Sequence, residues 1–76
     1  METVIKSAAE NTLKILKIKG ATITVTPSVI SFEDITKEEA IKIENAFVKA
    51  GMRSLGVTDL KEIEMGEGYE ISISIK

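Results

Sequence analysis

The sequence predicts a two-layer α+β fold, with two helices packed on one face of a small antiparallel sheet of three to four strands. Apolar residues recur at helical spacing in residues 2–19 and 37–50, and they alternate with polar residues, as strands do, in residues 21–26 and 69–75. The chain has 76 residues, which suffices for one hydrophobic core. We therefore expect residues 1–76 to form a single compact domain in which the helices cover one face of the sheet.

The first helix is expected to begin at Glu2, to continue to Lys19 and to end at Gly20, because no proline or glycine interrupts this segment. Its apolar positions are Ile5, Ala8, Ala9, Leu13 and Leu16. Residues 13–19 also alternate like a strand, so a shorter helix followed by a hairpin through Gly20 and Ala21 is the alternative.

Residues 21–26 alternate strictly and are rich in β-branched side chains, which predicts a half-exposed strand. Ile23 and Val25 would face the core, with threonines on the other face. Pro27 cannot donate a hydrogen bond to a neighbouring strand, so it marks an edge, a bulge or a turn before the extended residues 29–32. The sequence leaves open whether residues 21–33 form one bent strand or a hairpin.

The second helix has the clearest boundaries. Thr36 precedes Glu39 by three residues, which is the spacing of a capping box, and Thr36 is therefore the expected N-cap. Gly51 is the expected residue after the C-cap. The predicted apolar stripe consists of Ala40, Ile43, Phe47 and Ala50, broadened by Ile41 and Val48.

The C-terminal third of the chain is expected to contain a loop and a hairpin. Residues 52–59 look like a loop in which Leu55 and Val57 point inward. Residues 62–65 and 69–75 alternate and are separated by the turn Gly66-Glu67-Gly68, which predicts two antiparallel strands with one apolar and one polar face.

The sequence offers little for catalysis or metal binding. There is no cysteine and no histidine, so thiolate and imidazole ligands are missing, and the glycine spacings do not match a phosphate-binding loop. The carboxylates of Glu33, Asp34, Glu38 and Glu39 are close enough in sequence to suggest a calcium or magnesium site, but acidic residues are also favoured at a helix N-terminus. We expect no catalytic, cofactor-binding or metal site, no cofactor and no enzymatic activity.

Charge is distributed unevenly along the chain. Residues 1–20 carry four lysines and two glutamates, whereas the remaining residues have a net charge of −4 and the whole chain −2. The basic N-terminal helix makes a nucleic-acid-associated accessory protein the alternative function, although the acidic total argues against strong nucleic-acid binding.

The hydropathy and composition of the chain indicate its cellular location. No apolar run approaches the length of a membrane span, and the N-terminal residues lack a secretory pattern, so a cytoplasmic location without membrane association is expected. Abundant Ile, Lys and Glu, together with the absence of Gln, Cys, His and Trp, is typical of thermophilic proteins.

Two surface features suggest a binding function. The predicted strands carry a row of small hydroxyl side chains, and the predicted hairpin carries a row of carboxylates; these residues are Thr22, Thr24, Thr26, Ser72, Ser74, Glu62, Glu64, Glu67 and Glu70. A flat hydroxyl face or an unprotected strand edge can pair with another sheet. The predicted function is therefore a small non-catalytic protein-interaction or regulatory module whose partner is another protein or a second copy of itself in a homodimer, with no small-molecule substrate.

Overall fold

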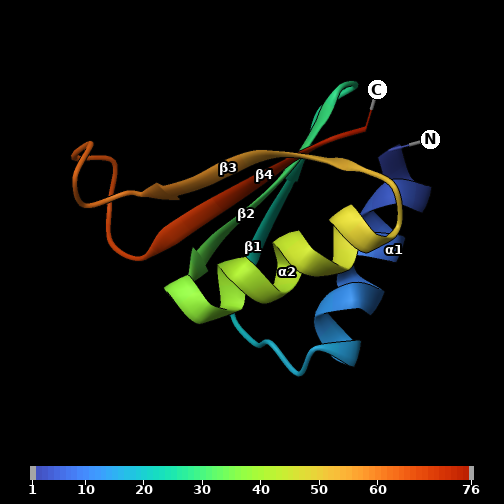
Figure 1. Ribbon diagram of the computed structural model, residues 1–76, viewed down its shortest axis with the longest axis horizontal. Coiled ribbons are helices and arrows are strands. Elements are labelled where there is room, and N and C mark those ends of the chain that lie inside the picture. The colour runs from blue at the N-terminus through green and yellow to red at the C-terminus, as the bar shows by residue number, and fades with distance from the viewer. Residues whose placement is uncertain (1, 76) are drawn as a thin grey trace.

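The computed structural model describes residues 2–75 and confirms the predicted α+β class (Figure 1). Its elements in chain order are α1 (Glu2–Ile15), β1 (Thr22–Val25), β2 (Val29–Ile35), α2 (Lys37–Lys49), β3 (Arg53–Asp59) and β4 (Tyr69–Ser74). Neither helix in this part of the chain is long and apolar enough to cross a membrane.

The four strands form one antiparallel sheet in the order β1-β2-β4-β3. The last strand, β4, lies between β2 and β3 and runs antiparallel to both, so β2 and β3 are parallel and are connected through α2 (Figure 1). Because β2 and β4 each pair on both sides, their side chains on the covered face are deeply buried: Phe32, Ile71 and Ile73 are fully inaccessible.

Both helices pack against the same face of the sheet. The core combines Ala9 and Leu13 of α1 with the stripe of α2 and with the inward residues of β2 and β4; its strand and α2 members are Ile30, Phe32, Ile35, Ala40, Ile43, Phe47, Ile71 and Ile73. The rings of Phe32 and Phe47 meet at a centroid distance of 5.6 Å. Four of the apolar helix positions predicted from the sequence, Ala8, Ile41, Val48 and Ala50, are exposed instead.

The boundaries of α2 are those that the sequence predicts. The Thr36 hydroxyl accepts a hydrogen bond from the Glu39 backbone N–H at 3.1 Å, and the Thr36 backbone N–H donates to the Glu39 carboxylate at 2.9 Å. At the other end, the Gly51 N–H donates to Val48 and the Met52 N–H donates to Phe47, with Gly51 at φ 90°. This is the Schellman arrangement that glycine favours after a C-cap.

The first helix ends at Ile15, so the predicted extension to Lys19 is wrong. The Ile18 N–H donates to the Leu13 carbonyl and the Lys17 N–H to the Lys14 carbonyl, with Lys17 at φ 59°. This is a second Schellman arrangement, which turns the buried Ile18 into the core beside Leu13. A continued helix would leave Ile18 without this packing. No hairpin forms through Gly20 either, since residues 2–21 contain no strand.

Residues 21–33 form a hairpin, which decides between the two alternatives. Val25 pairs with Ile30, and the four residues from Thr26 to Val29 make the turn. Pro27 occupies the second position of this turn, where its fixed φ angle is favourable.

The C-terminal third differs from the sequence-based expectation. Residues 53–59, predicted as a loop, form β3 at the edge of the sheet, and residues 62–65, predicted as a strand, form a turn. A bulge in β3 sets Leu55 and Gly56 opposite the single residue Ser72, and Leu55 is 49% exposed rather than inward as predicted. The strand that forms a hairpin with β4 is therefore β3 and not residues 62–65, and the loop of this hairpin is longer than the sequence suggests.

Candidate interaction surfaces

The face of the sheet opposite the helices, which we call the open face, carries three rows of side chains across the strands. Paired residues of neighbouring strands share a face, so the register places Thr24, Ser31, Ser72 and Gly56 in a middle row. One flanking row contains Val29, Ser74 and Arg53, and the other contains Thr22, Glu33, Glu70 and Thr58. Among residues 2–75, both helices lie on the other side of the sheet, so no helix covers these rows.

Short hydroxyl side chains form the middle of the open face. The predicted surface residues Thr24 and Ser72 lie on either side of Ser31, and the hydroxyl oxygens of Ser31 and Ser72 are 3.2 Å apart in a hydrogen bond. Ser31 was missed by the sequence analysis, although it alternates with the buried Ile30 and Phe32 as the threonines of β1 alternate with Ile23 and Val25. The row Thr24, Ser31, Ser72 and Gly56 consequently carries only short, uncharged side chains, and the exposed Leu55 adjoins its β3 end at the bulge.

Two carboxylates meet at one end of the open face, beside a bulge in β2. The register shifts between Phe32 and Ile35, and Asp34 adopts φ 62°. The Asp34 carboxylate turns to β1, where it accepts a hydrogen bond from the Thr22 hydroxyl at 2.6 Å. Glu33 remains on the open face beside Glu70 of β4.

The neighbouring carboxyl raises the pKa of Glu70. The largest cause is a hydrogen bond with Glu33, followed by partial burial of Glu70 and repulsion from the Glu33 charge, while a hydrogen bond from Ser72 opposes the increase. This pair is the part of the open face where negative charge is concentrated, while Arg53 supplies a positive charge at the opposite row.

Thr26, which was also predicted to belong to the partner surface, is exposed and lies in the turn between β1 and β2. Its hydroxyl accepts the Val29 N–H at 3.0 Å and thereby closes the turn between β1 and β2. Its role is to fix the hairpin.

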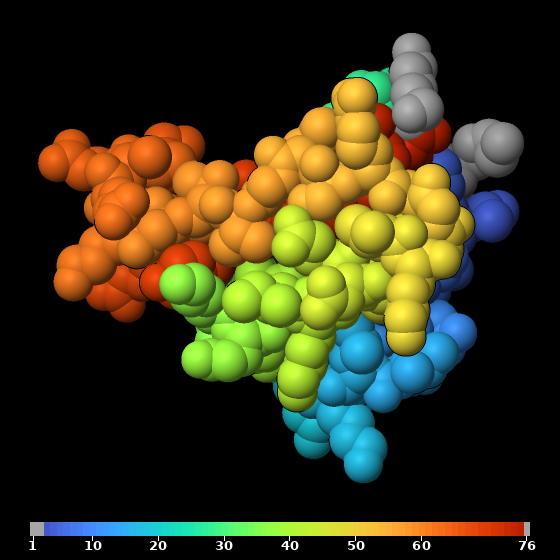
Figure 2. Space-filling model, in the orientation of Figure 1, coloured from blue at the N-terminus to red at the C-terminus, as the bar shows by residue number. Residues whose placement is uncertain are grey.

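The predicted row of four glutamates is also divided by the structure. Glu70 lies on the open face, whereas Glu62, Glu64 and Glu67 lie in the loop between β3 and β4, which we call the acidic loop and define as residues 60–68. Figure 2 shows this loop, in orange, projecting from the body of the protein. The acidic loop also exposes two apolar side chains, Ile63 at 53% and Met65 at 73%.

The acidic loop has a defined backbone. The Leu60 N–H donates to the Gly68 carbonyl across the base of the loop, and the Met65 N–H donates to the Leu60 carbonyl at 2.9 Å. Leu60 is buried, and Gly68 passes so close to β2 that an added Cβ would lie 3.1 Å from the Ile35 carbonyl oxygen. The loop is therefore anchored at its base and presents its glutamates and apolar side chains at the tip.

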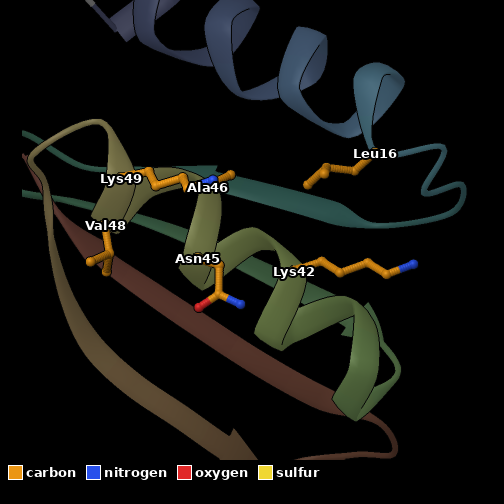
Figure 3. Close-up of a pocket in the computed structure, with 6 residues that line it drawn as sticks. All are labelled: Leu16, Lys42, Asn45, Ala46, Val48 and Lys49. Carbon is orange, nitrogen blue, oxygen red and sulfur yellow. The ribbon is translucent and has the colours of Figure 1, made fainter.

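A groove of about 550 Å³ lies on the helical side, between the end of α1 and the outer face of α2. Its lining residues, labelled in Figure 3, are Leu16, Lys42, Asn45, Ala46, Val48 and Lys49. We call it the helical groove. Leu16 and Ala46 give it an apolar floor, and Val48 is 51% exposed at its side. Lys42 and Lys49 are seven residues apart on α2, which sets them about 10 Å apart along the helix axis.

The acidic residues suggested as a cation site are used separately. Glu39 belongs to the capping box, Asp34 accepts from Thr22, and Glu33 lies beside Glu70. Within residues 2–75, no three His, Cys, Asp or Glu side chains converge as ligands for a metal ion.

Comparison with protein-family models, with curated proteins and with solved structures found no match for this chain.

Proposed function

We propose that this chain is a small non-catalytic interaction module that acts in the cytoplasm and self-associates by packing the open faces of two copies against each other. The observation that carries this proposal is that the sheet is covered by helices on one face only, while the centre of its other face consists of short hydroxyl side chains. A single core of this size contributes a small net stability, so burial of a second face would add to it substantially.

The charge pattern of the open face supports a second copy as the partner. Arg53 lies in one flanking row, and the Glu33–Glu70 pair lies in the other, with the hydroxyl row between them. A twofold axis that lies in the interface plane, runs diagonally to the strands and passes the Ser31–Ser72 pair would bring Arg53 of each copy toward the carboxyl pair of the other. The face is thus complementary to itself, and its small central side chains allow two sheets to approach closely.

Sedimentation equilibrium combined with thermal unfolding tests this proposal. We expect a dimer whose melting temperature rises with protein concentration, because association stabilises the folded state by mass action. Thr24→Lys, in the middle row, should shift the equilibrium toward monomer, and Ser72→Lys should do the same. The matched control is Ser7→Lys, which adds the same charge at an exposed position of α1. A monomer mass and an unchanged melting temperature over a wide concentration range would contradict the proposal.

A charge exchange tests the twofold arrangement itself. Arg53→Glu should weaken the dimer because the new carboxylate would face the Glu33–Glu70 pair of the other copy. Adding Glu70→Lys to this variant restores both the net charge and the complementarity, so the dimer should recover. Dimerisation that is equally strong in the wild type and in both variants would exclude this face.

The alternative function, a nucleic-acid-associated accessory protein, is favoured by one feature of the structure: Lys42 and Lys49 of α2 lie beside the C-terminal end of α1 and extend its basic surface. Titration with a labelled duplex at several salt concentrations tests it. Binding that weakens steeply with salt and is lost in Lys42→Ala/Lys49→Ala would support this function.

A further inference from the structure

We propose that the acidic loop of one copy docks into the helical groove of a second copy. This contact goes beyond the face-to-face pairing proposed above, because it uses neither the open face nor a strand edge. It gives the protein a second surface for self-association, at which complementary charges select the partner.

The first argument is the construction of the acidic loop. Its tip exposes Ile63 and Met65 beside three glutamates, and neither apolar side chain belongs to the core. Two hydrogen bonds to Leu60 and Gly68 hold the backbone of the loop in place. A preformed projection that displays apolar side chains loses little conformational entropy on binding, which favours a docking role.

The second argument is the chemistry of the helical groove. Its apolar floor and its two lysines match the two kinds of side chain at the loop tip, because Ile63 or Met65 would contact Leu16 and Ala46 while loop carboxylates approach Lys42 and Lys49. The volume of about 550 Å³ lies within the range of roughly 300 to 1,000 Å³ that is usual for binding pockets. Apolar contact would provide affinity, and charge would select the partner.

The third argument is that the loop and the groove of one chain are separated. The acidic loop projects from the end of the sheet that lies away from α1, as Figures 1 and 2 show, whereas the groove is lined by Leu16, the residue that directly follows α1. The anchored base of the loop, at Leu60 and Gly68, prevents it from folding back. The complementary surfaces can therefore meet only between copies, either reciprocally within a pair or successively along a chain.

A charge-exchange experiment in the open-face variant Thr24→Lys isolates this contact. In that background, Lys42→Glu/Lys49→Glu sets an acidic groove against an acidic loop, and Glu62→Lys/Glu64→Lys sets a basic loop against a basic groove. Each protein alone should associate at least about tenfold more weakly than the background, since like charges at an interface are strongly unfavourable. Mixed in equal amounts, the two should associate again, because each loop then faces a groove of opposite charge.

A matched control separates this contact from attraction between oppositely charged proteins. Lys6→Glu/Lys14→Glu changes the net charge by the same amount as the groove variant, at exposed positions of α1 that do not line the groove. This control should associate with the loop variant more weakly than the groove variant does, because its acidic loop still fits the basic groove of the loop variant while the basic loop of that variant meets a basic groove. Met65→Ser tests the apolar part: the side chain is 73% exposed, so the melting temperature of the monomer should not change while association weakens.

The outcomes distinguish the two proposed contacts. Association that is lost in Thr24→Lys alone and is insensitive to the loop and groove variants would overturn the loop contact and leave the open face as the interface. Association that is sensitive only to the loop and groove variants would support the loop contact and overturn the open-face proposal. Failure of the groove and loop variants to associate when mixed would overturn the loop contact. Equal association of the loop variant with the groove variant and with the Lys6→Glu/Lys14→Glu control would overturn it as well. So would binding of nucleic acid, in place of the loop, to Lys42 and Lys49.

Discussion

Replacement of Phe47 by alanine should nearly unfold the protein. The side chain is 8% exposed, lies on the buried stripe of α2 and stacks at a tilt on Phe32. Removing a buried phenylalanine costs about 3 to 5 kcal/mol. At about 0.05 to 0.15 kcal/mol per residue, a chain of 76 residues has a total stability of about 4 to 11 kcal/mol. The loss is therefore comparable to the lower part of this range.

Urea denaturation monitored by circular dichroism measures this effect, with the free energy of unfolding obtained by linear extrapolation. Phe47→Leu, which keeps most of the volume, should cost less than about 1.5 kcal/mol and gives a measurable transition if the alanine variant is already unfolded. The control is the neighbouring Val48→Ala, at a side chain that is 51% exposed, for which a change within about 0.5 kcal/mol is expected. A Phe47→Ala protein with a near-native transition midpoint, or a Val48→Ala loss of the same size, would refute the orientation of α2.

Three further predictions concern local features. Thr36→Ala removes the side-chain acceptor of the capping box and should cost about 1 kcal/mol in chemical denaturation, with Ser restoring most of it; a neutral Thr36→Ala would contradict the cap. The Glu33 carboxyl raises the pKa of Glu70 in the folded state, so the contribution of Glu70 to stability falls as the pH rises through that raised pKa. Glu70→Gln should remove this loss. Melting temperatures of the variant and the wild type that differ by a constant amount over the interval from the ordinary to the raised pKa would contradict this prediction. Gly68→Ala should destabilise the protein more than Gly20→Ala in urea denaturation. Both glycines have φ near 80°, but only the Cβ at Gly68 would crowd the backbone of β2. Equal losses of stability would show that the base of the acidic loop moves to accommodate the Cβ.

The sequence predicted the elements whose signals are local. The capping box of α2 needs only Thr36 and Glu39, and its C-terminal turn needs only Gly51, so both boundaries of α2 are confirmed. The strict alternation of residues 69–75 likewise predicted β4, and four of the five predicted hydroxyl residues, Thr22, Thr24, Ser72 and Ser74, lie on one face of the sheet.

Elements that depend on partners far away in the sequence were predicted wrongly. Residues 53–59 contain a glycine and few apolar side chains, and they are a strand because β4 offers a free edge to which they can pair. Residues 62–65 have strand-like alternation, but with that edge occupied by β3 they form a turn and carry Ile63 and Met65 into the exposed loop. In α1, helical spacing continued to Lys19, whereas burial of Ile18 ended the helix earlier.

The sequence by itself therefore determined the fold class, the extent of α2 and the alternation of β1 and β4, since propensity, capping and hydrophobic period act within a few residues. The tertiary structure alone decided which strands are neighbours. It thereby brought Glu33 beside Glu70, placed Ser31 between Thr24 and Ser72, and separated the loop glutamates from the open face. These juxtapositions follow from pairing across the sheet, where residues as far apart in the sequence as Val29 and Ser74 are partners, and no local pattern encodes that register.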